Sequence, residues 1–176
     1  MKNRSLGPEQ KALLDVARLM CLAARTAPKT KGIDNIVLKI LKKPAFSKII
    51  KEMERTATEE NKSSFYRDAQ NLKQSGLLIL IGCRSNPMGI TYCGFCGHNN
   101  CRELSKTKGI CAFNSIDLGI AAGSAVSIAC LHHADNRIMY SIGKAAIKKD
   151  LFKDKSIKQA LGIPLSASGK NPFFDR

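Results

Sequence analysis

The sequence has no tryptophan, only three tyrosines and about half as many acidic as basic residues, 14 against 29. With so few aromatic rings available for stacking on bases, recognition of single-stranded RNA has little support. The seven cysteines are an odd number, which excludes a fully paired disulfide framework. A chain of 176 residues can build its own core without disulfides, so we expect a reducing compartment, where clustered cysteines bind metal.

Several functional patterns are also missing. The N-terminus has no apolar signal region, and the least charged stretch, residues 118–134, is short and contains two glycines and His132-His133. We therefore expect a cytoplasmic protein without a membrane span. The sequence contains no Ser-His-Asp arrangement, paired carboxylates or H-E-x-x-H pattern. Hydrolytic chemistry thus has no support, and no catalytic residue is assigned.

The positive charge is spread along the chain and forms no single tail. The formal net charge of +15 divides into +7 over residues 1–62, +3 over 63–134 and +5 over 135–176. Lysine outnumbers arginine 20 to 9, and lysine is typical of solvated faces, whereas arginine is favoured in specific contacts to phosphates and bases. The charge therefore fits an anionic small ligand, an acidic protein partner or a solubilising surface, and nucleic acid is not the expected partner.

Apolar spacing, prolines and glycines predict more helix than strand. The expected helices span about residues 8–27, 34–43, 46–53, 64–74, 114–133 and 142–151. The expected strands span about residues 77–83, 137–142 and 160–167. Because residues 77–83 form a short, continuous apolar run, we expect them to be buried on both faces. The sequence thus predicts a single domain over residues 1–176 with an α+β fold (an α/β sandwich), mostly helical around a small sheet.

The segment 84–111 differs from the rest because it is rich in Gly, Asn and Cys and poor in large apolar side chains. We expect it to form a small inserted module. Its four cysteines have the spacing C-x2-C-x4-C-x9-C and are Cys93, Cys96, Cys101 and Cys111. Four thiolates within 19 residues can converge on one centre, and Gly94 and Gly97 allow backbone amides to approach the sulfurs. Asn100 is expected to cap a short helix, with Glu103 as its partner.

The four thiolates fit either a [4Fe–4S] cluster or a tetrahedral zinc ion. Zinc sites of this kind usually pair two C-x2-C knuckles, and the single knuckle here favours the cluster. His98 is an alternative zinc ligand in place of one cysteine. Cys21 and Cys130 lie on apolar faces of expected helices, where core packing is the interpretation.

The segment Tyr92-Cys-Gly-Phe-Cys-Gly-His-Asn-Asn-Cys-Arg-Glu resembles the CGxCGxxxCxE signature of the four-cysteine [4Fe–4S] domain. That domain occurs in corrinoid iron–sulfur proteins and in membrane-associated redox complexes of anaerobes. The resemblance implies that the four cysteines hold a [4Fe–4S] cluster. The gap between Cys101 and Cys111 is shorter than in that domain, so Cys83 is the alternative to Cys111 as a ligand.

Three further segments extend the resemblance over nearly the whole chain. They lie around Ala27-Pro28, over residues 117–124 and over residues 162–176. Together with the cysteine module they resemble a family of ferredoxin-domain proteins from anaerobic bacteria and archaea that has no settled biochemical activity. That resemblance implies an iron–sulfur protein without indicating a substrate.

The same segments resemble, more weakly, FMN-dependent nitroreductases. In those proteins an AP-S-x-x-N loop contacts the flavin, and a GxP…KPR C-terminus brings a basic residue to the phosphate. Here Lys29 stands in place of the serine, and the N-terminal double-arginine motif is reduced to Arg4. The resemblance implies a nitroreductase-like fold, a homodimer that builds its flavin site across the interface, and FMN contacts from Arg25, Lys29, Asn35, Lys170 and Arg176.

These observations together predict an iron–sulfur redox protein that transfers single electrons. With FMN bound as well, the cluster would relay electrons to the flavin of an oxidoreductase. The basic surface would dock an acidic electron carrier. The alternative is a zinc-stabilised binding module whose basic surface contacts an acidic partner or RNA.

Overall fold

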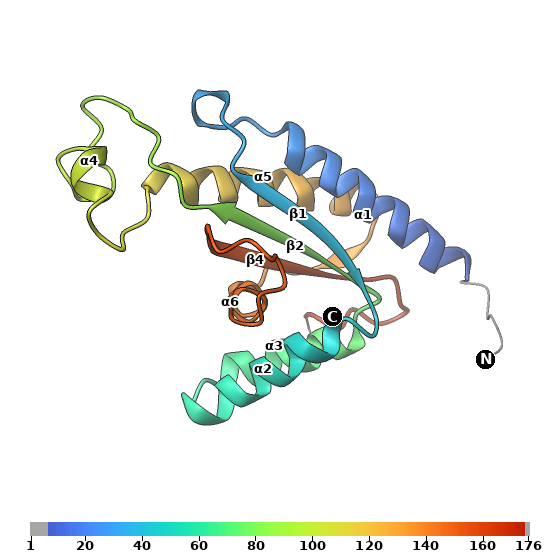
Figure 1. Cartoon of the computed structure of the whole chain (residues 1–176). Coiled ribbons are helices and arrows are strands. Elements are labelled where there is room, and N and C mark those ends of the chain that lie inside the picture. Colours follow the sequence, from blue (N-terminus) through green and yellow to red (C-terminus); the bar gives the residue numbers. More distant parts are fainter. Residues whose placement is uncertain (1–6, 175–176) are drawn as a thin grey trace.

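The computed structural model describes residues 7–174 and arranges them in three layers around one antiparallel sheet with the strand order β1-β2-β4-β3 (Figure 1). The strands are β1 (Ile36–Lys42), β2 (Leu77–Arg84), β3 (Asp135–Asn136) and β4 (Ile157–Ser166). The helices are α1 (Pro8–Thr26), α2 (Phe46–Glu59), α3 (Ser63–Gln74), α4 (Cys101–Leu104), α5 (Ala112–Leu131) and α6 (Tyr140–Lys148). A short 3₁₀ helix covers Thr30–Gly32. The predicted α+β fold, mostly helical around a small sheet, is confirmed.

The strand β2 lies inside the sheet and divides the protein into two cores. Residues 77–83 are all buried, as their continuous apolar sequence predicted. Because successive side chains of a strand point to opposite faces, Ile79 and Ile81 join the core beneath α1 and α5. Leu78 and Leu80 join the second core, beneath α2, α3 and α6.

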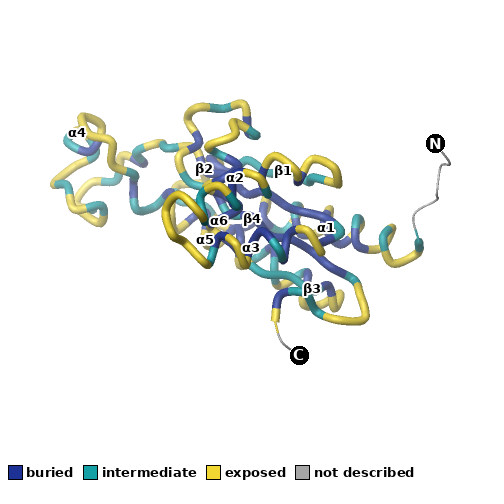
Figure 2. The backbone as a smooth tube through the Cα atoms, turned by 90° about the horizontal axis from the view of Figure 1, so that it is seen from below, coloured by how far each residue is buried: buried dark blue, intermediate teal, exposed yellow. Residues whose placement is uncertain are grey.

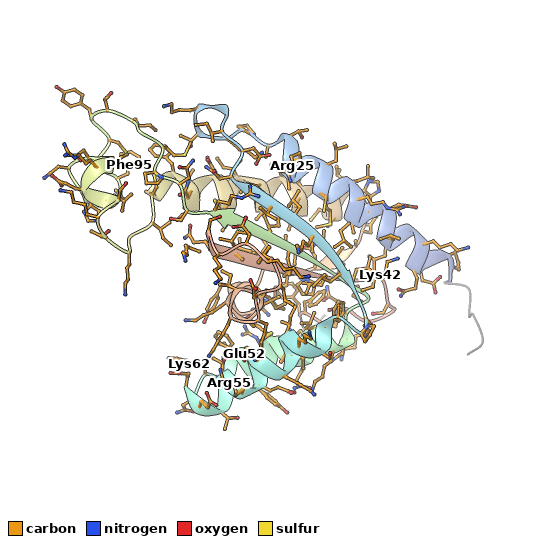
Figure 3. All side chains as sticks on the ribbon, viewed as in Figure 1. Arg25, Lys42, Glu52, Arg55, Lys62 and Phe95 are labelled. Atoms are coloured by element: carbon orange, nitrogen blue, oxygen red, sulfur yellow. The ribbon has the colours of Figure 1, made fainter. Side chains whose placement is uncertain are left out.

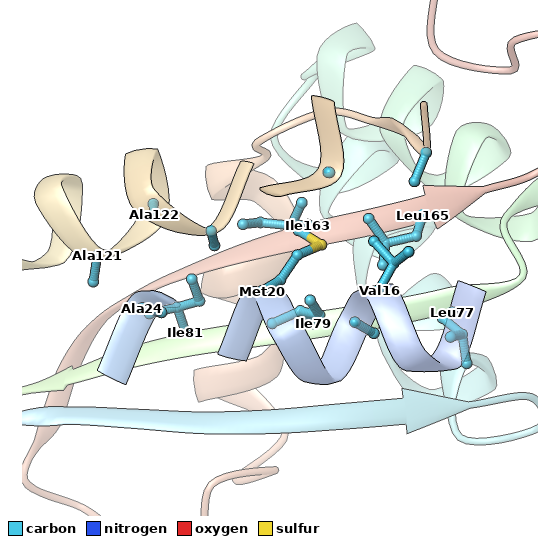
Figure 4. Packing of buried hydrophobic residues seen from close by; sticks show 14 of the residues in the cluster. Val16, Met20, Ala24, Leu77, Ile79, Ile81, Ala121, Ala122, Ile163 and Leu165 are labelled. Carbon is cyan, nitrogen blue, oxygen red and sulfur yellow. The ribbon is translucent and has the colours of Figure 1, made fainter. Parts of the chain in front are cut away.

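The core beneath α1 and α5 depends on small side chains (Figure 4). Met20 of α1 fills the space above Ile79 and Ile163, while Ala121 and Ala122 of α5 let the two helices pack closely on the sheet. By length and composition alone, α5 is the one helix in the described residues that would suffice to cross a membrane. In this fold it is a core helix against α1 and the sheet.

The helix predicted over residues 34–43 is wrong, because the chain forms the strand β1 there. Its apolar residues also fit a strand, in which Ile36 and Ile40 face the first core and Leu41 faces the second. Every residue of β1 pairs antiparallel with a residue of β2, and this pairing supplies the backbone hydrogen bonds that a helix would otherwise have made within itself. Asp34, predicted to cap a helix, instead accepts a hydrogen bond at 3.0 Å from the backbone N–H of Ile36, the first residue of β1.

The strand predicted over residues 137–142 is also misplaced. Only Asp135–Asn136 form β3, followed by a single bridge between Met139 and Gly162, and α6 then begins at Tyr140. The helix α6 lies directly against β4 because a glycine of each element faces the other element: Gly143 of α6 faces β4, and Gly162 of β4 faces α6. A Cβ on Gly143 would lie 1.8 Å from the carbonyl oxygen of Ala160, and one on Gly162 would lie 2.2 Å from Ile142.

We expect Gly143→Ala to lower the free energy of unfolding by about 1–3 kcal/mol, because α6 must move away from the β4 backbone to admit the methyl group. Urea denaturation measures the loss. Gly119→Ala is the matched control, since a Cβ there meets no atom within 4 Å, and it should leave stability unchanged or raise it by about 0.5–1 kcal/mol. A Gly143→Ala variant as stable as the wild type would contradict this contact between α6 and β4.

Candidate metal centre

The cysteine-rich segment projects from the end of the sheet where β2 ends (Figure 1). It follows Arg84 at the end of β2 and returns to the fold at Cys111, the N-cap residue of α5. Most of the segment is exposed or half-buried (Figure 2). It nevertheless has a small core of its own, formed by Met88, Leu104 and Cys111. The segment is therefore attached to the main fold at both ends and packs around a separate centre.

Glycine and a capped turn shape the part of this segment that carries three cysteines. Gly94 and Gly97 have positive φ angles of 66° and 80°, and the N–H of Gly97 donates to the carbonyl oxygen of Gly94 at 2.9 Å. Asn100 Oδ1 accepts from the N–H of Glu103 at 3.0 Å, and Glu103 Oε2 accepts from the N–H of Asn99 at 3.1 Å. The predicted cap by Asn100 is confirmed, and it places Cys101 at the first position of α4.

All seven cysteines are free thiols. Cys93, Cys96 and Cys101 are half-buried, whereas Cys111 is buried, and Cys96 packs against the same small core as Cys111. Phe95, exposed beside them, stacks on Phe113 with 5.5 Å between ring centroids (Figure 3). Within residues 7–174, no three His, Cys, Asp or Glu side chains are grouped closely enough to hold a metal ion.

The donor chemistry of the segment still fits a metal centre. Four unpaired thiols from one loop are the ligand set of a [4Fe–4S] cluster or of a zinc ion. A second observation lies one helical turn after Cys111: in the described residues, Asn114 Nδ2 is the buried side-chain nitrogen or oxygen that has no hydrogen-bond partner. Since a buried amide donor is costly to leave unpaired, this position suits an acceptor such as a thiolate or sulfide.

Cys83 lies at the end of β2 and is 1% exposed. Burial raises the pKa of the Cys83 thiol to about 11, and the carboxylates of Asp117 and Asp34 add to the rise. Cys83 is near enough to Cys111 for the two to interact electrostatically. It is therefore a protonated, buried thiol next to the segment and not a part of it.

The other two cysteines lie away from this centre. Cys21 of α1 is half-buried and packs against the first core, as predicted, and burial raises the pKa of its thiol. Cys130 near the end of α5 is exposed, so its predicted core packing is wrong. The sequence pattern did not reveal the exposure of Cys130, because α5 is apolar on its exposed face as well. Ile116 and Ile120 of that helix are 42% and 40% exposed.

Two of the residues predicted to contact FMN are engaged within the chain. Arg25, at the last turn of α1, donates to the carboxylate of Asp34 and, at 2.9 Å, to the carbonyl oxygen of Ile36 (Figure 3). Lys29 Nζ donates to carbonyl oxygens at the end of α1, at 2.6 Å to Arg25 and 2.8 Å to Ala27. Both cations therefore fasten the chain between α1 and β1.

Asn35, the third residue predicted to contact FMN, also has hydrogen-bond partners within the chain. Its side chain is buried, its Nδ2 donates to the sulfur of Met88 at 3.6 Å, and its Oδ1 accepts from Asn86 Nδ2 at 3.4 Å. The N–H of Asn86 in turn donates to Asn114 Oδ1 at 3.0 Å. These three asparagines tie the start of β1, the cysteine-rich segment and α5 together.

Lys170 lies at the opposite end of the sheet. Ile36 pairs with Cys83 at one end, whereas Leu77 pairs with Leu165 at the other, shortly before Lys170. Here Lys170 lines a surface cavity of about 490 Å³ with polar side chains from α3 and from the C-terminal segment. These are Arg67, Asn71, Gln74, Ser168 and Asn171. Within one chain, Lys170 is not brought together with Arg25, Lys29 and Asn35, and Arg176 and Arg4 lie outside the described residues.

Sequence reasoning missed the polar residues on the buried side of α5. Asp117 is 2% exposed and accepts hydrogen bonds from the N–H and hydroxyl of Thr30, at 3.1 and 2.8 Å. Asn114, one turn earlier, is fully buried. A signal for both was available, since strongly polar residues spaced by three in an otherwise apolar helix point to partners on its buried face.

Comparison with known proteins supports the predicted relationship. A family model described as an uncharacterised protein containing a ferredoxin domain matches residues 107–176, which include Cys111 but not the other three cysteines of the segment. An uncharacterised protein of Archaeoglobus fulgidus is 40% identical over 168 residues, which cover 91% of this chain and 89% of the archaeal protein.

Solved nitroreductase structures share the architecture at low sequence identity. A nitroreductase with bound FMN from Desulfitobacterium hafniense has a TM-score of 0.62 and 12% identity, covering 96% of this chain and 82% of its own. An FMN-dependent nitroreductase from Mycobacterium smegmatis, in complex with NADPH, has a TM-score of 0.57 and 11% identity, with 89% and 78% covered. At these identities the likeness concerns the fold, and it agrees with the arrangement of helices and strands described above. The chain thus has the nitroreductase fold, and its archaeal relative and family match establish that it belongs to the ferredoxin-domain family.

Proposed function

We propose that the protein is an iron–sulfur redox protein in which Cys93, Cys96, Cys101 and Cys111 hold a [4Fe–4S] cluster. The observation that carries the proposal is the set of four free thiols within one short segment of the chain. When bound, such a cluster supplies one-electron transfer. The match of residues 107–176, which include Cys111, to the family described as containing a ferredoxin domain supports this assignment.

The residues around the loop have defined parts in this proposal. Gly94 and Gly97 adopt backbone conformations that open space around the C-x2-C step. Cys111 is the N-cap of the 20-residue helix α5, whose positive end favours a thiolate or an anionic cluster. The buried contacts of Met88 and Leu104 exclude water from one side of the loop. The chain would therefore provide the cluster with its thiolate ligands, with the positive end of a helix and with apolar side chains that shield one side of it from water.

The fold also supports a proposal for FMN and for a homodimer. An FMN phosphate needs fixed cations, and Lys170 and Arg67 line the cavity of about 490 Å³. Arg25 and Lys29 lie at the other end of the sheet from this cavity. They can contact the same FMN as Lys170 only in a homodimer in which Arg25 and Lys29 of a second copy lie at the cavity. The FMN that the Desulfitobacterium hafniense structure contains is consistent with this, and with FMN the protein would act as an oxidoreductase.

The surface of the segment fits an acidic electron carrier. Arg102, Lys106 and Lys108 are exposed around α4, and the ring of Phe95 is 70% exposed beside them. Cations around an exposed aromatic side chain give both electrostatic steering and apolar contact area. The seven unpaired cysteines support the cytoplasm, a reducing compartment, as the location that we propose.

The absorption spectrum of anaerobically purified protein tests the proposal. We expect a broad visible band that dithionite bleaches and about four iron atoms per chain. Separate flavin peaks, with FMN released on heating, would extend the assignment to a flavin oxidoreductase. A colourless protein with one zinc ion per chain would overturn it in favour of the zinc-stabilised binding module.

A further inference from the structure

We propose that Asn71 is the specificity-determining residue of an anion site in the cavity of about 490 Å³ between α3 and the C-terminal segment. Its side-chain amide donates a hydrogen bond to an oxygen of a phosphate ester, and Lys170 and Arg67 balance the negative charge of the phosphate. This inference rests on the proposed function for its ligand, since FMN is the phosphate ester that the site takes, and it does not involve the cluster.

The Asn71 side chain is buried at the cavity wall without a hydrogen-bond partner. Asn71 is 9% exposed and lines the cavity. Its backbone carbonyl oxygen accepts from the hydroxyl of Ser75 at 2.8 Å, but within residues 7–174 its side-chain amide makes no hydrogen bond. In the part of the chain that the structure describes, Asn114 Nδ2 is the unpaired atom that is sealed from solvent, so the amide of Asn71 is open to the cavity. Since buried polar groups are nearly always paired, this amide fits a partner that a ligand supplies.

The cavity around Asn71 is positively charged. Lys170 and Arg67 line it, and none of the described residues that line it is acidic. Arg67 is held in place because its Nε and Nη2 donate to the carboxylate of Asp68 at 3.0 and 2.8 Å, which leaves Nη1 without a partner in the described residues. Two cations beside an amide donor are the kind of groups that bind a phosphate.

Hydrogen bonds fix the C-terminal side of the cavity. The hydroxyl of Ser168 donates to the carbonyl oxygen of Lys170 at 2.7 Å. Asn171 Oδ1 accepts from the N–H of Phe173 at 2.8 Å, and Asn171 Nδ2 donates to Asp135 Oδ1 at 2.7 Å. These bonds shape the segment around Lys170 before a ligand arrives, and a preformed site binds with less loss of conformational freedom.

Asn71 differs from the two cations in what it recognises. Lys170 and Arg67 are exposed, so they attract any anion and are screened by salt. The amide of Asn71 is buried and directional, and it therefore favours a ligand that places an oxygen at its Nδ2. Because the oxygens of an ionised phosphate accept hydrogen bonds, Nδ2 and not Oδ1 makes this contact.

Titration of FMN into the flavin-free, full-length protein, followed by flavin fluorescence, tests this role. We expect Asn71→Leu to weaken FMN binding about tenfold, because one hydrogen bond to a charged acceptor is lost. The thermal stability of the flavin-free variant should be unchanged or higher, since an unpaired amide gives way to an apolar side chain of similar size. Riboflavin, which lacks the phosphate, should bind the wild type and Asn71→Leu equally.

Gln70→Leu is the matched control. Gln70 is the preceding residue of α3 and carries the same amide group, but it contacts Glu54 at 3.4 Å and does not line the cavity. Its substitution should leave the affinity for FMN at the wild-type value.

The outcomes separate this inference from the proposed function. An Asn71→Leu variant that binds FMN as tightly as the wild type would overturn the role of Asn71 and leave FMN binding intact. A variant that also loses riboflavin binding or thermal stability would overturn it too, because the effect would not come from the phosphate. A wild type that binds no FMN, but that inorganic phosphate stabilises against heat more than it stabilises Asn71→Leu, would defeat FMN as the ligand and keep the anion site. A wild type that responds to neither probe would defeat both.

Discussion

If the proposed cluster is bound, we expect the Cys96→Ser substitution to remove the iron and the visible absorption of the anaerobically purified protein, and we expect Cys21→Ser to leave both unchanged. The physical reason is the position of each thiol. Cys96 lies in the loop beside Cys111 and packs against the same small core. Cys21 packs against the first core from α1 and is not part of the small core of the cysteine-rich segment. A hydroxyl is a much poorer ligand for iron than a thiolate, so the loss in the Cys96→Ser variant is expected to be nearly complete.

Iron and sulfide analysis, together with the spectrum, measures this effect. Circular dichroism of both variants distinguishes loss of the cluster from loss of the fold, and we expect the helical signal to be kept because the cysteine-rich loop has its own core outside the two main ones. Equal iron content in the two variants would contradict the ligand assignment.

The same measurement decides between Cys111 and Cys83 as the fourth ligand. Cys111 starts α5 and faces the small core of the loop, so Cys111→Ser should lose iron as Cys96→Ser does. Cys83→Ser should keep it, because Cys83 lies in β2 and its side chain packs in the first core and not in the small core of the cysteine-rich segment. The reverse result would make Cys83 the ligand and would explain the short gap between Cys101 and Cys111.

Sequence patterns were informative where one local rule decides the structure. The short apolar run of β2 between glycines favoured a strand buried on both faces, and Asn100 three residues before Glu103 favoured a helix cap. The strand β1 was missed because its apolar residues satisfy helical and strand spacing alike, and pairing with β2 decides between them. Such pairing is a long-range property that a local pattern does not contain.

The candidate site likewise has a part that a local sequence pattern predicts and a part that depends on long-range contacts. The cysteine spacing marks the loop, but the Asn35–Asn86–Asn114 network joins three segments far apart in the sequence. The partners of Lys29 within the chain could not be predicted either, since the basic sequence around it suggested a phosphate contact, whereas its ammonium also donates to carbonyl oxygens at the end of α1. Charge can be counted from a sequence, but the partner of each charge depends on the fold.

Substitution of Glu52 by glutamine has the largest expected effect on stability. Glu52 lies on α2 with its side chain 1% exposed, between α2 and the end of α6 (Figure 3). Its carboxylate contacts Arg55 at 2.6 Å, Lys149 at 2.8 Å and Lys148 at 3.1 Å. Removing the negative charge takes the shared carboxylate from both lysines and leaves Arg55 with Glu59 alone, and breaking a buried pair costs about 3–5 kcal/mol. Because the cations are themselves about half exposed, we expect about 3 kcal/mol at neutral pH.

The effect has a defined pH dependence. The hydrogen bond from Arg55, with those from the two lysines, lowers the pKa of Glu52 from 4.5 to about 2. A carboxyl group with a lowered pKa in the folded state stabilises the protein fully above its unfolded pKa, and this contribution is lost as the pH falls to the folded value. The stability difference between the wild type and Glu52→Gln should therefore be constant above pH 4.5 and shrink steadily toward pH 2.

Urea denaturation of both proteins at a series of pH values measures this difference, and Asp15→Asn is the matched control. Asp15 pairs with Arg18 at 2.8 Å, but both side chains are about two-thirds exposed, so its loss should change stability little at any pH. A gap between the wild type and Glu52→Gln that stays constant down to pH 2 would mean that packing and not charge is lost. A gap that closes as the pH falls, with none in the control, would show that Glu52 joins α2 to α6 through its ionised carboxylate.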